Sequence, residues 1–175
     1  MRNSIKIVIA ALLIVLPTLV SAQKSYKFGH ISSEDILTTI PDRDSAMTTL
    51  QKYGKELENQ LEEMQVELNN KVEKLRQDEA AGKLSDLVKK TRYDEVTNMQ
   101  QRIQQFQEGA QQEYQTKQMQ LMQPIIEKIK KAITEVGKEN GFIYIFDTST
   151  NAIPYVSSES QDVTNLVKQK LGIKK

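Results

Sequence analysis

The feature that most restricts the fold is a long stretch, residues 42–123, with no proline and only three glycines, Gly54, Gly82 and Gly109. Its apolar residues recur at spacings of three and four, which places them on one narrow stripe of a helix. A stripe this narrow is typical of the seam of a coiled coil. The expected seam consists of Leu50, Leu57, Leu61, Met64, Leu68, Val72 and Leu75 in the first half, and of Val88, Val96, Met99, Ile103, Phe106, Ala110 and Tyr114 in the second.

The stretch is expected to form two helices that turn back on each other near Gly82. Glycine suits the end of a helix because it adopts a positive φ without steric cost, and Ser85 is placed to cap the returning helix. At a rise of ~1.5 Å per residue, each helix of this arm would be roughly 60 Å long. The residues expected to face each other are Leu50 with Tyr114, Leu57 with Phe106, Leu61 with Ile103, Met64 with Met99, Leu68 with Val96, Leu75 with Val88, and Gly54 with Gly109.

The first residues have the pattern of a secretory signal peptide. Arg2 and Lys6 precede an apolar run at 7–20, and small residues end the segment at Ala22. The run is shorter than the ~20 residues of a membrane-spanning helix and is interrupted by Pro17, so a permanent anchor is the weaker alternative. We therefore expect export, with cleavage after Ala22.

The predicted domains are a signal peptide at 1–22, a helical-hairpin arm at 42–123, and a discontinuous oligomerisation body built from 23–41 and 124–175. The chain has no cysteine to form a disulfide, and a body this small is expected to self-associate. The predicted fold class is α+β, mostly α, with the long antiparallel coiled-coil arm on the small β-containing body.

The body is expected to contain three strands or strand-like segments and several helices. In chain order these are a strand at 26–31, a short helix that begins at Ser32 or Ser33 and ends before Pro41, a helix that Pro124 begins or kinks, a strand at 142–146, an edge strand at 152–156, and a last helix from about Asp162, with Val163, Leu166, Val167 and Leu171 facing inward.

Charge and composition argue against several functions. The chain has 24 Lys and Arg against 23 Asp and Glu, and two of the basic residues lie in the expected signal peptide, so the mature chain is nearly neutral. Nucleic-acid binding driven by overall charge is therefore not expected. His30 is the only histidine, and without cysteine there is no zinc constellation or Cys/His pair. A glycine-rich phosphate loop is also lacking, so we expect no enzyme, no metal and no cofactor such as ATP.

Charge is unevenly distributed along the arm. Residues 71–92, around the turn, carry seven basic residues against four acidic ones, whereas 51–70 carry two basic and five acidic ones. Two interpretations stay open: a solvated helix surface with patchy charge, or a basic tip that contacts an acidic membrane surface or acidic polypeptide segments. The candidate tip residues are Arg76, Lys83, Lys89, Lys90 and Arg92.

Gly54 and Gly109 are candidate hinge residues in the arm. Each should weaken its helix by roughly 1 kcal/mol relative to alanine. If they lie at the same level, the arm could bend there. The alternative is that two small residues merely allow a close approach of the helices.

The order and lengths of these elements resemble the Skp/OmpH family of periplasmic chaperones. The resemblance covers the whole mature chain and rests on KFGHI at 27–31, the long hairpin, GFIYIFD at 141–147 and DVT at 162–164. It implies a homotrimer whose strands join in a central body, with three arms around a cavity. It also implies binding of unfolded outer-membrane proteins without ATP, although members of the family are strongly basic and this chain is not. The alternative is a coiled-coil scaffold or adhesin that binds one folded envelope partner.

Overall fold

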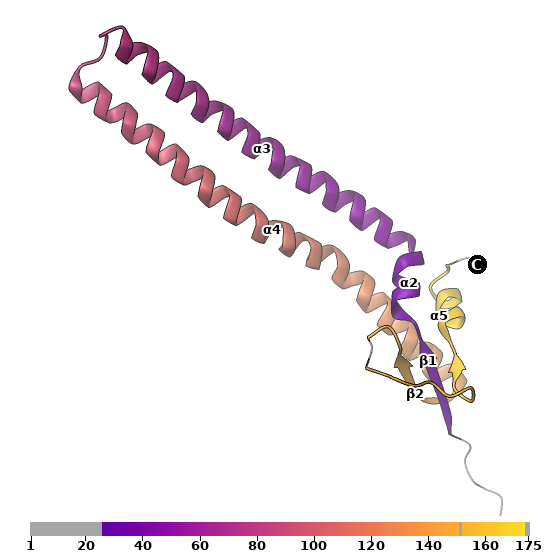
Figure 1. The fold of residues 1–175 in the computed structure, drawn as a ribbon. Helices are drawn as coiled ribbons and strands as arrows, with labels where there is room; N and C mark the ends of the chain where they lie inside the picture. Colours follow the sequence, from indigo (N-terminus) through magenta and orange to yellow (C-terminus); the bar gives the residue numbers. More distant parts are fainter. Residues whose placement is uncertain (1–25, 151, 174–175) are drawn as a thin grey trace, which may run out of the picture.

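The computed structural model describes residues 26–150 and 152–173, so the expected signal peptide lies outside the described residues. A long helical hairpin carries a small sheet and two short helices at its open end (Figure 1). The fold class predicted from the sequence is confirmed. The elements are β1 Lys27–Ile31, α2 Ser33–Thr39, α3 Pro41–Ala80, α4 Asp86–Asn140, β2 Phe142–Asp147, β3 Gln161–Asp162 and α5 Thr164–Lys170.

The turn of the arm is built as the sequence predicts. Gly82 has a φ of 65°. Its N–H donates to the carbonyl of Glu79, and the N–H of Lys83 donates to the carbonyl of Asp78. This pair of bonds is the Schellman motif, which satisfies the last carbonyls of α3. The hydroxyl of Ser85 then accepts a bond from a backbone N–H in the first turn of α4, which caps the returning helix.

The expected pairing of the two arm helices is wrong by about one helical turn. Tyr114 does not face Leu50, because its ring lies against Gly54, one turn further along α3. Gly109 consequently does not face Gly54. An apolar seam repeats with nearly every turn, so sliding one helix by a turn still brings apolar residues together. The seam alone therefore leaves the register open.

Most of the predicted seam is buried or half-buried, with two exceptions near the tip. Leu50 and Leu75 are buried, but Val72 and Val88 are 41% and 40% exposed. Met64, Leu68 and Val72 are separated by four residues each, and two such steps in succession rotate Val72 away from the seam. Lys71 takes the position closer to α4.

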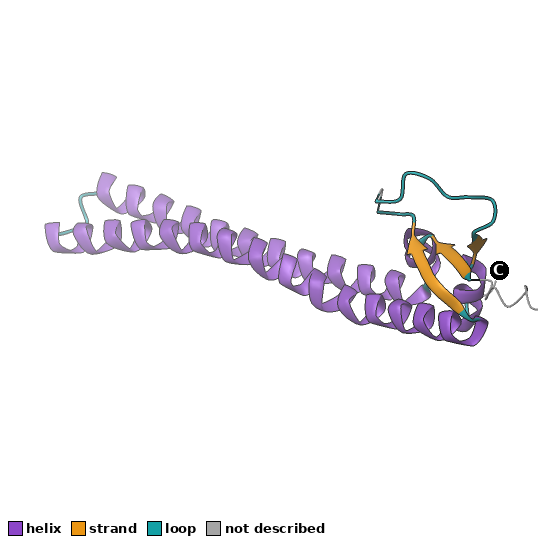
Figure 2. Cartoon of the chain, turned by 90° about the horizontal axis from the view of Figure 1, so that it is seen from below, coloured by secondary structure: helices purple, strands orange, loops and turns teal. Residues whose placement is uncertain are grey.

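The sheet of the body is parallel, with strand order β2-β1-β3. The strand expected at 152–156 is wrong, and the third strand is the two-residue β3. Consecutive parallel strands need a crossover, because the chain must return to the end at which the first strand began. Residues 148–150 and 152–160 belong to this crossover between the two edge strands, which leaves 152–156 without a strand partner. Figure 2 shows it as a long loop beside the sheet.

The core lies between the sheet and the helices α2, α4 and α5. Val163 and Val167 are buried as expected, but Leu166 is exposed because it lies on the outer side of α5. Pro124 does not begin a helix, since α4 continues through it from the arm into the body. The buried core residues are Ile31, Ile36, Ile40, Ala46, Ile125, Ile129, Ala132, Val136, Val163 and Val167.

Candidate functional site

The polar residues of the body form structural contacts rather than a reacting site. His30 Nδ1 lies 3.0 Å from the hydroxyl oxygen of Ser160. Within residues 26–150 and 152–173, no three His, Asp or Glu side chains are grouped so that they could hold a metal ion. Every buried side-chain nitrogen or oxygen in the same part of the chain has a hydrogen-bond partner. These polar side chains thus take part in contacts within the fold.

Asp147 fastens the end of β2 to the start of α2. The hydroxyl of Ser33 donates to one carboxylate oxygen at 2.5 Å, and the hydroxyl of Ser149 donates to the other at 2.6 Å. Burial raises the pKa of Asp147, but the hydrogen bonds from Ser149 and Ser33 outweigh burial and hold that pKa below its usual value. The carboxylate therefore holds Ser33 and Ser149 at the end of β2.

One face of the sheet carries an aromatic cluster that no helix covers. Gly29 and Ile31 of β1 are directed toward the core, so the alternating residues point the other way. Tyr144 stacks between Phe28 and Phe146, with ring centroids 6.4 Å and 5.8 Å apart. These three rings are 45%, 60% and 41% exposed in chain order. Sequence reasoning missed this face, although the alternation in β1 and β2 could have indicated it.

The tip residues predicted from the sequence divide into paired and unpaired groups. Arg92 binds Asp78 across the hairpin at 2.6 Å, and this hydrogen bond lowers the pKa of the Asp78 carboxyl. Arg76 lies 3.4 Å from Glu73 on its own helix. Both arginines thus have their charges partly neutralised by carboxylates.

The three tip lysines have no such partner. Lys83, Lys89 and Lys90 make no ion pair with any described residue. Leu87 lies among them in the first turn of α4 and is 76% exposed. The tip therefore combines three available cations with one projecting apolar side chain, a combination that the charge count alone did not predict.

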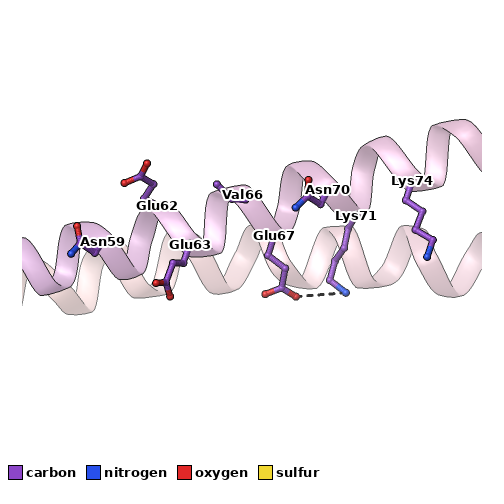
Figure 3. A pocket seen from close by; sticks show the side chains of 8 residues that line it. All are labelled: Asn59, Glu62, Glu63, Val66, Glu67, Asn70, Lys71 and Lys74. Carbon is purple, nitrogen blue, oxygen red and sulfur yellow. Dashed lines mark ion pairs between the residues drawn. The ribbon is translucent and has the colours of Figure 1, made fainter.

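A shallow groove follows the exposed face of α3 halfway along the arm (Figure 3). Its only apolar side chain is Val66, which is 52% exposed. Glu67 pairs with Lys71 at 3.7 Å along the groove. The other lining residues are Asn59, Glu62, Glu63, Asn70 and Lys74. The middle of the arm is thus a polar surface with isolated apolar points.

The described part of the chain has no helix that is both long enough and apolar enough to span a membrane.

A family model described as outer membrane protein (OmpH-like) matches residues 27–171, which include both the arm and the body. The chain belongs to the OmpH-like family.

Its relatives within the OmpH-like family include chaperones. The chain is 26% identical over 157 residues to the chaperone protein Skp of Photorhabdus laumondii, which covers 86% of this chain and 88% of the relative. It is 24% identical over 160 residues to the chaperone protein Skp of Pectobacterium atrosepticum, which covers 91% and 94% of the two chains. By family the chain is thus a chaperone and not an enzyme, and the alternative of a scaffold or adhesin is not favoured.

A solved structure supports the same fold. The chain superposes on an OmpH-like outer membrane chaperone from Caulobacter crescentus with a TM-score of 0.71, over 83% of each chain and at 12% sequence identity. At this identity the likeness concerns the arrangement of arm and body, and not individual side chains.

Proposed function

We propose that this OmpH-like chain is an ATP-independent holdase of the periplasm, which binds unfolded outer-membrane proteins and prevents their aggregation. The observation that carries the proposal is a long two-helix arm that projects from a small body with an uncovered aromatic face. The names of its family and relatives support the same class of clients. The periplasmic location rests on the predicted signal peptide at 1–22, and sequencing the N-terminus of the exported protein tests cleavage after Ala22.

The proposed assembly is a homotrimer formed through the body. Phe28, Tyr144 and Phe146 are too exposed for a single copy to bury, and burying them against other copies would remove a contiguous apolar patch from water. The body is also small for independent stability. Three copies joined at the bodies would extend three arms around one cavity.

In this proposal the arms bind unfolded clients through many weak contacts. Val66 and Met119 are 52% and 65% exposed on otherwise polar helices. Methionine adapts its shape to different apolar partners. Scattered apolar contacts of this kind suit clients that share no sequence, whereas one folded partner would need a continuous complementary surface.

The tip is proposed to contact an acidic surface, either a membrane or a client segment. Lys83, Lys89 and Lys90 supply charge, and Leu87 could enter the interface between lipid headgroups and acyl chains. Arg76 and Arg92 contribute less because each already lies beside a carboxylate. Gly54 and Gly109 lie at different levels of the arm, so bending that adjusts the arms to clients of different size would occur at two separate points and not at one shared hinge.

The test is to dilute several unrelated outer-membrane proteins out of denaturant, with and without the mature chain and without ATP. Light scattering should show less aggregation for all of them at a fixed ratio of arms to client. A water-soluble protein in its folded state serves as the control and should not bind. Suppression of only one client, or capture of the folded control, would favour the scaffold alternative.

A further inference from the structure

The lower arm, which is the part of α3 and α4 nearer the body, contains an interhelical contact. There an aromatic ring occupies the space left by a glycine. A Cβ placed on Gly54 would lie 3.0 Å from the ring of Tyr114, closer than real Cβ atoms normally come to a neighbour. The helix α3 therefore has a notch at this level, and the ring of Tyr114 fills it. Alanine at position 54 could be accommodated only if the ring moved.

Polar contacts join the two helices at residues that neighbour Gly54 and Tyr114 in the sequence. The hydroxyl of Tyr53 donates to the Glu113 carboxylate at 2.6 Å, which joins α3 to α4. The ammonium of Lys117 lies 5.7 Å from the centroid of the Tyr53 ring, within the range of a cation–π contact. The hydrogen bond to Glu113 also raises the pKa of Tyr53, so the phenol keeps the proton that it donates.

Gly109 has none of these features. A Cβ at Gly109 would meet no atom within 4 Å outside its own helix. The two glycines of the arm thus differ: one receives a side chain from the opposite helix, and the other lies in open space. A hinge at Gly54 can open only if Tyr114 leaves the notch, whereas nothing comparable holds Gly109.

We propose that Tyr53, Gly54, Glu113, Tyr114 and Lys117 form a latch that holds the two arm helices together, and that withdrawal of the Tyr114 ring is the step that opens the lower arm. Closed, the latch holds α3 against α4 at the level of Gly54 and Tyr114. When the latch is open, α3 and α4 can separate locally. Between Leu50 and Leu75, no other residue of the α3 seam is fully buried to hold the helices together. The latch is a property of the free chain and does not depend on which clients bind.

Native-state hydrogen exchange on the mature chain tests the latch, with Gly109→Ala as the matched control for Gly54→Ala. Gly109→Ala should slow exchange of nearby amides by about fivefold, because alanine favours the helix. Gly54→Ala should instead speed exchange at 50–57 and 110–117, because the new Cβ displaces the ring. In a Tyr114→Ala background, Gly54→Ala should slow exchange by about fivefold, as at Gly109. If Gly54→Ala slows exchange equally with and without the ring, the latch does not exist.

A second pair of variants keeps the test decisive if Gly54→Ala folds poorly. Tyr53→Phe removes one hydroxyl from the latch, and Tyr93→Phe removes the hydroxyl that donates to Glu79 at 3.0 Å near the tip. Tyr53→Phe should speed exchange at 50–57 and 110–117 by about threefold, the value of one modest hydrogen bond. Tyr93→Phe should leave those amides unchanged. Equal exchange in native protein and Tyr53→Phe, or equal acceleration by both variants, would overturn the proposal.

Discussion

One contact within the arm and one within the body differ in how far apart their residues lie in the sequence. In the arm, α3 and α4 are neighbours in sequence, and a pair such as Asp78 and Arg92 is separated by only 14 positions. In the body, Ser33 bonds to Asp147 across 114 positions. Loop closure costs less entropy for nearby residues, so the arm can form progressively from its turn. The body can form only when both ends of the chain meet.

The two regions also differ in how completely they bury their apolar residues. The arm buries a narrow seam between its two helices, and most of its surface is polar. The body buries Ile36 and Val167 fully yet leaves Phe28, Tyr144 and Phe146 exposed. This difference supports the proposed assembly through the body.

The largest expected effect is loss of assembly through the body, while the arm stays folded. Tyr144→Glu places a charge at the centre of the aromatic cluster, where desolvating it on assembly would be costly. We expect loss of the oligomer in sedimentation at micromolar concentration, with the helical circular dichroism of the arm retained. Tyr93→Glu, an equally drastic change at an exposed tyrosine of the arm, should sediment as the native protein does. Native mass for Tyr144→Glu would contradict assembly through this face.

The next effect concerns the tip of the arm. Changing Lys83, Lys89 and Lys90 together to Gln should weaken binding to anionic vesicles by roughly 100-fold at low salt, at about 1 kcal/mol per lysine near the surface. The loss should fade at high salt, where exposed charges are screened.

The matched control for the tip changes three exposed lysines of the body, Lys130, Lys131 and Lys138, to Gln. Vesicle flotation and sedimentation then measure binding and oligomer mass. Adding Arg92→Gln to the tip variant should change vesicle binding little, because that side chain pairs with Asp78. If the triple tip variant floats with vesicles as the native protein does, the tip is only a solvated surface with patchy charge.

A smaller effect compares the same valine-to-alanine substitution in the two regions. Val167→Ala should lower the free energy of unfolding by roughly 2 kcal/mol, because it removes buried methyl groups and leaves a cavity. Val66→Ala, on the exposed face of α3, should change it by less than ~0.5 kcal/mol. Urea unfolding at one fixed protein concentration measures both, since oligomer stability depends on concentration. Similar losses would mean that the arm packs as tightly as the body.

The smallest effect is a pH dependence confined to the body. The folded pKa of Asp147 lies below its ordinary value of 3.8, so its stabilising contribution is present above about that pH and is lost as the pH falls through the folded pKa. Asp147→Asn should therefore be less stable than the native protein at neutral pH, and the difference should shrink below pH ~4.

The comparison variant for this pH dependence lies at the tip. Asp78→Asn removes a carboxylate whose pKa is lowered by the hydrogen bond from Arg92, and it should alter hydrogen exchange near the turn without changing unfolding of the body. A constant difference between native protein and Asp147→Asn from pH 7 to pH 2 would show that Asp147 does not stabilise the body through its charge.

Local signals in the sequence were sufficient for most element boundaries. Gly82 and Ser85 place the turn, and Asn140 with Gly141 ends α4, where Gly141 has a φ of 70°. These signals depend on residues within a few positions of each other, because helix caps are satisfied by nearby backbone groups. The stripe of apolar residues likewise determined that there would be an arm.

Three features depended on how the helices and strands are aligned in space, and only the tertiary structure decided them. The register of α3 on α4 placed Tyr114 at Gly54, because a periodic seam is compatible with several offsets of one turn. The third strand formed at Gln161–Asp162 because a parallel crossover consumed the residues before it. The pairing of Arg92 with Asp78 depended in turn on that register, since charges at the same tip become partners only when their helices are aligned.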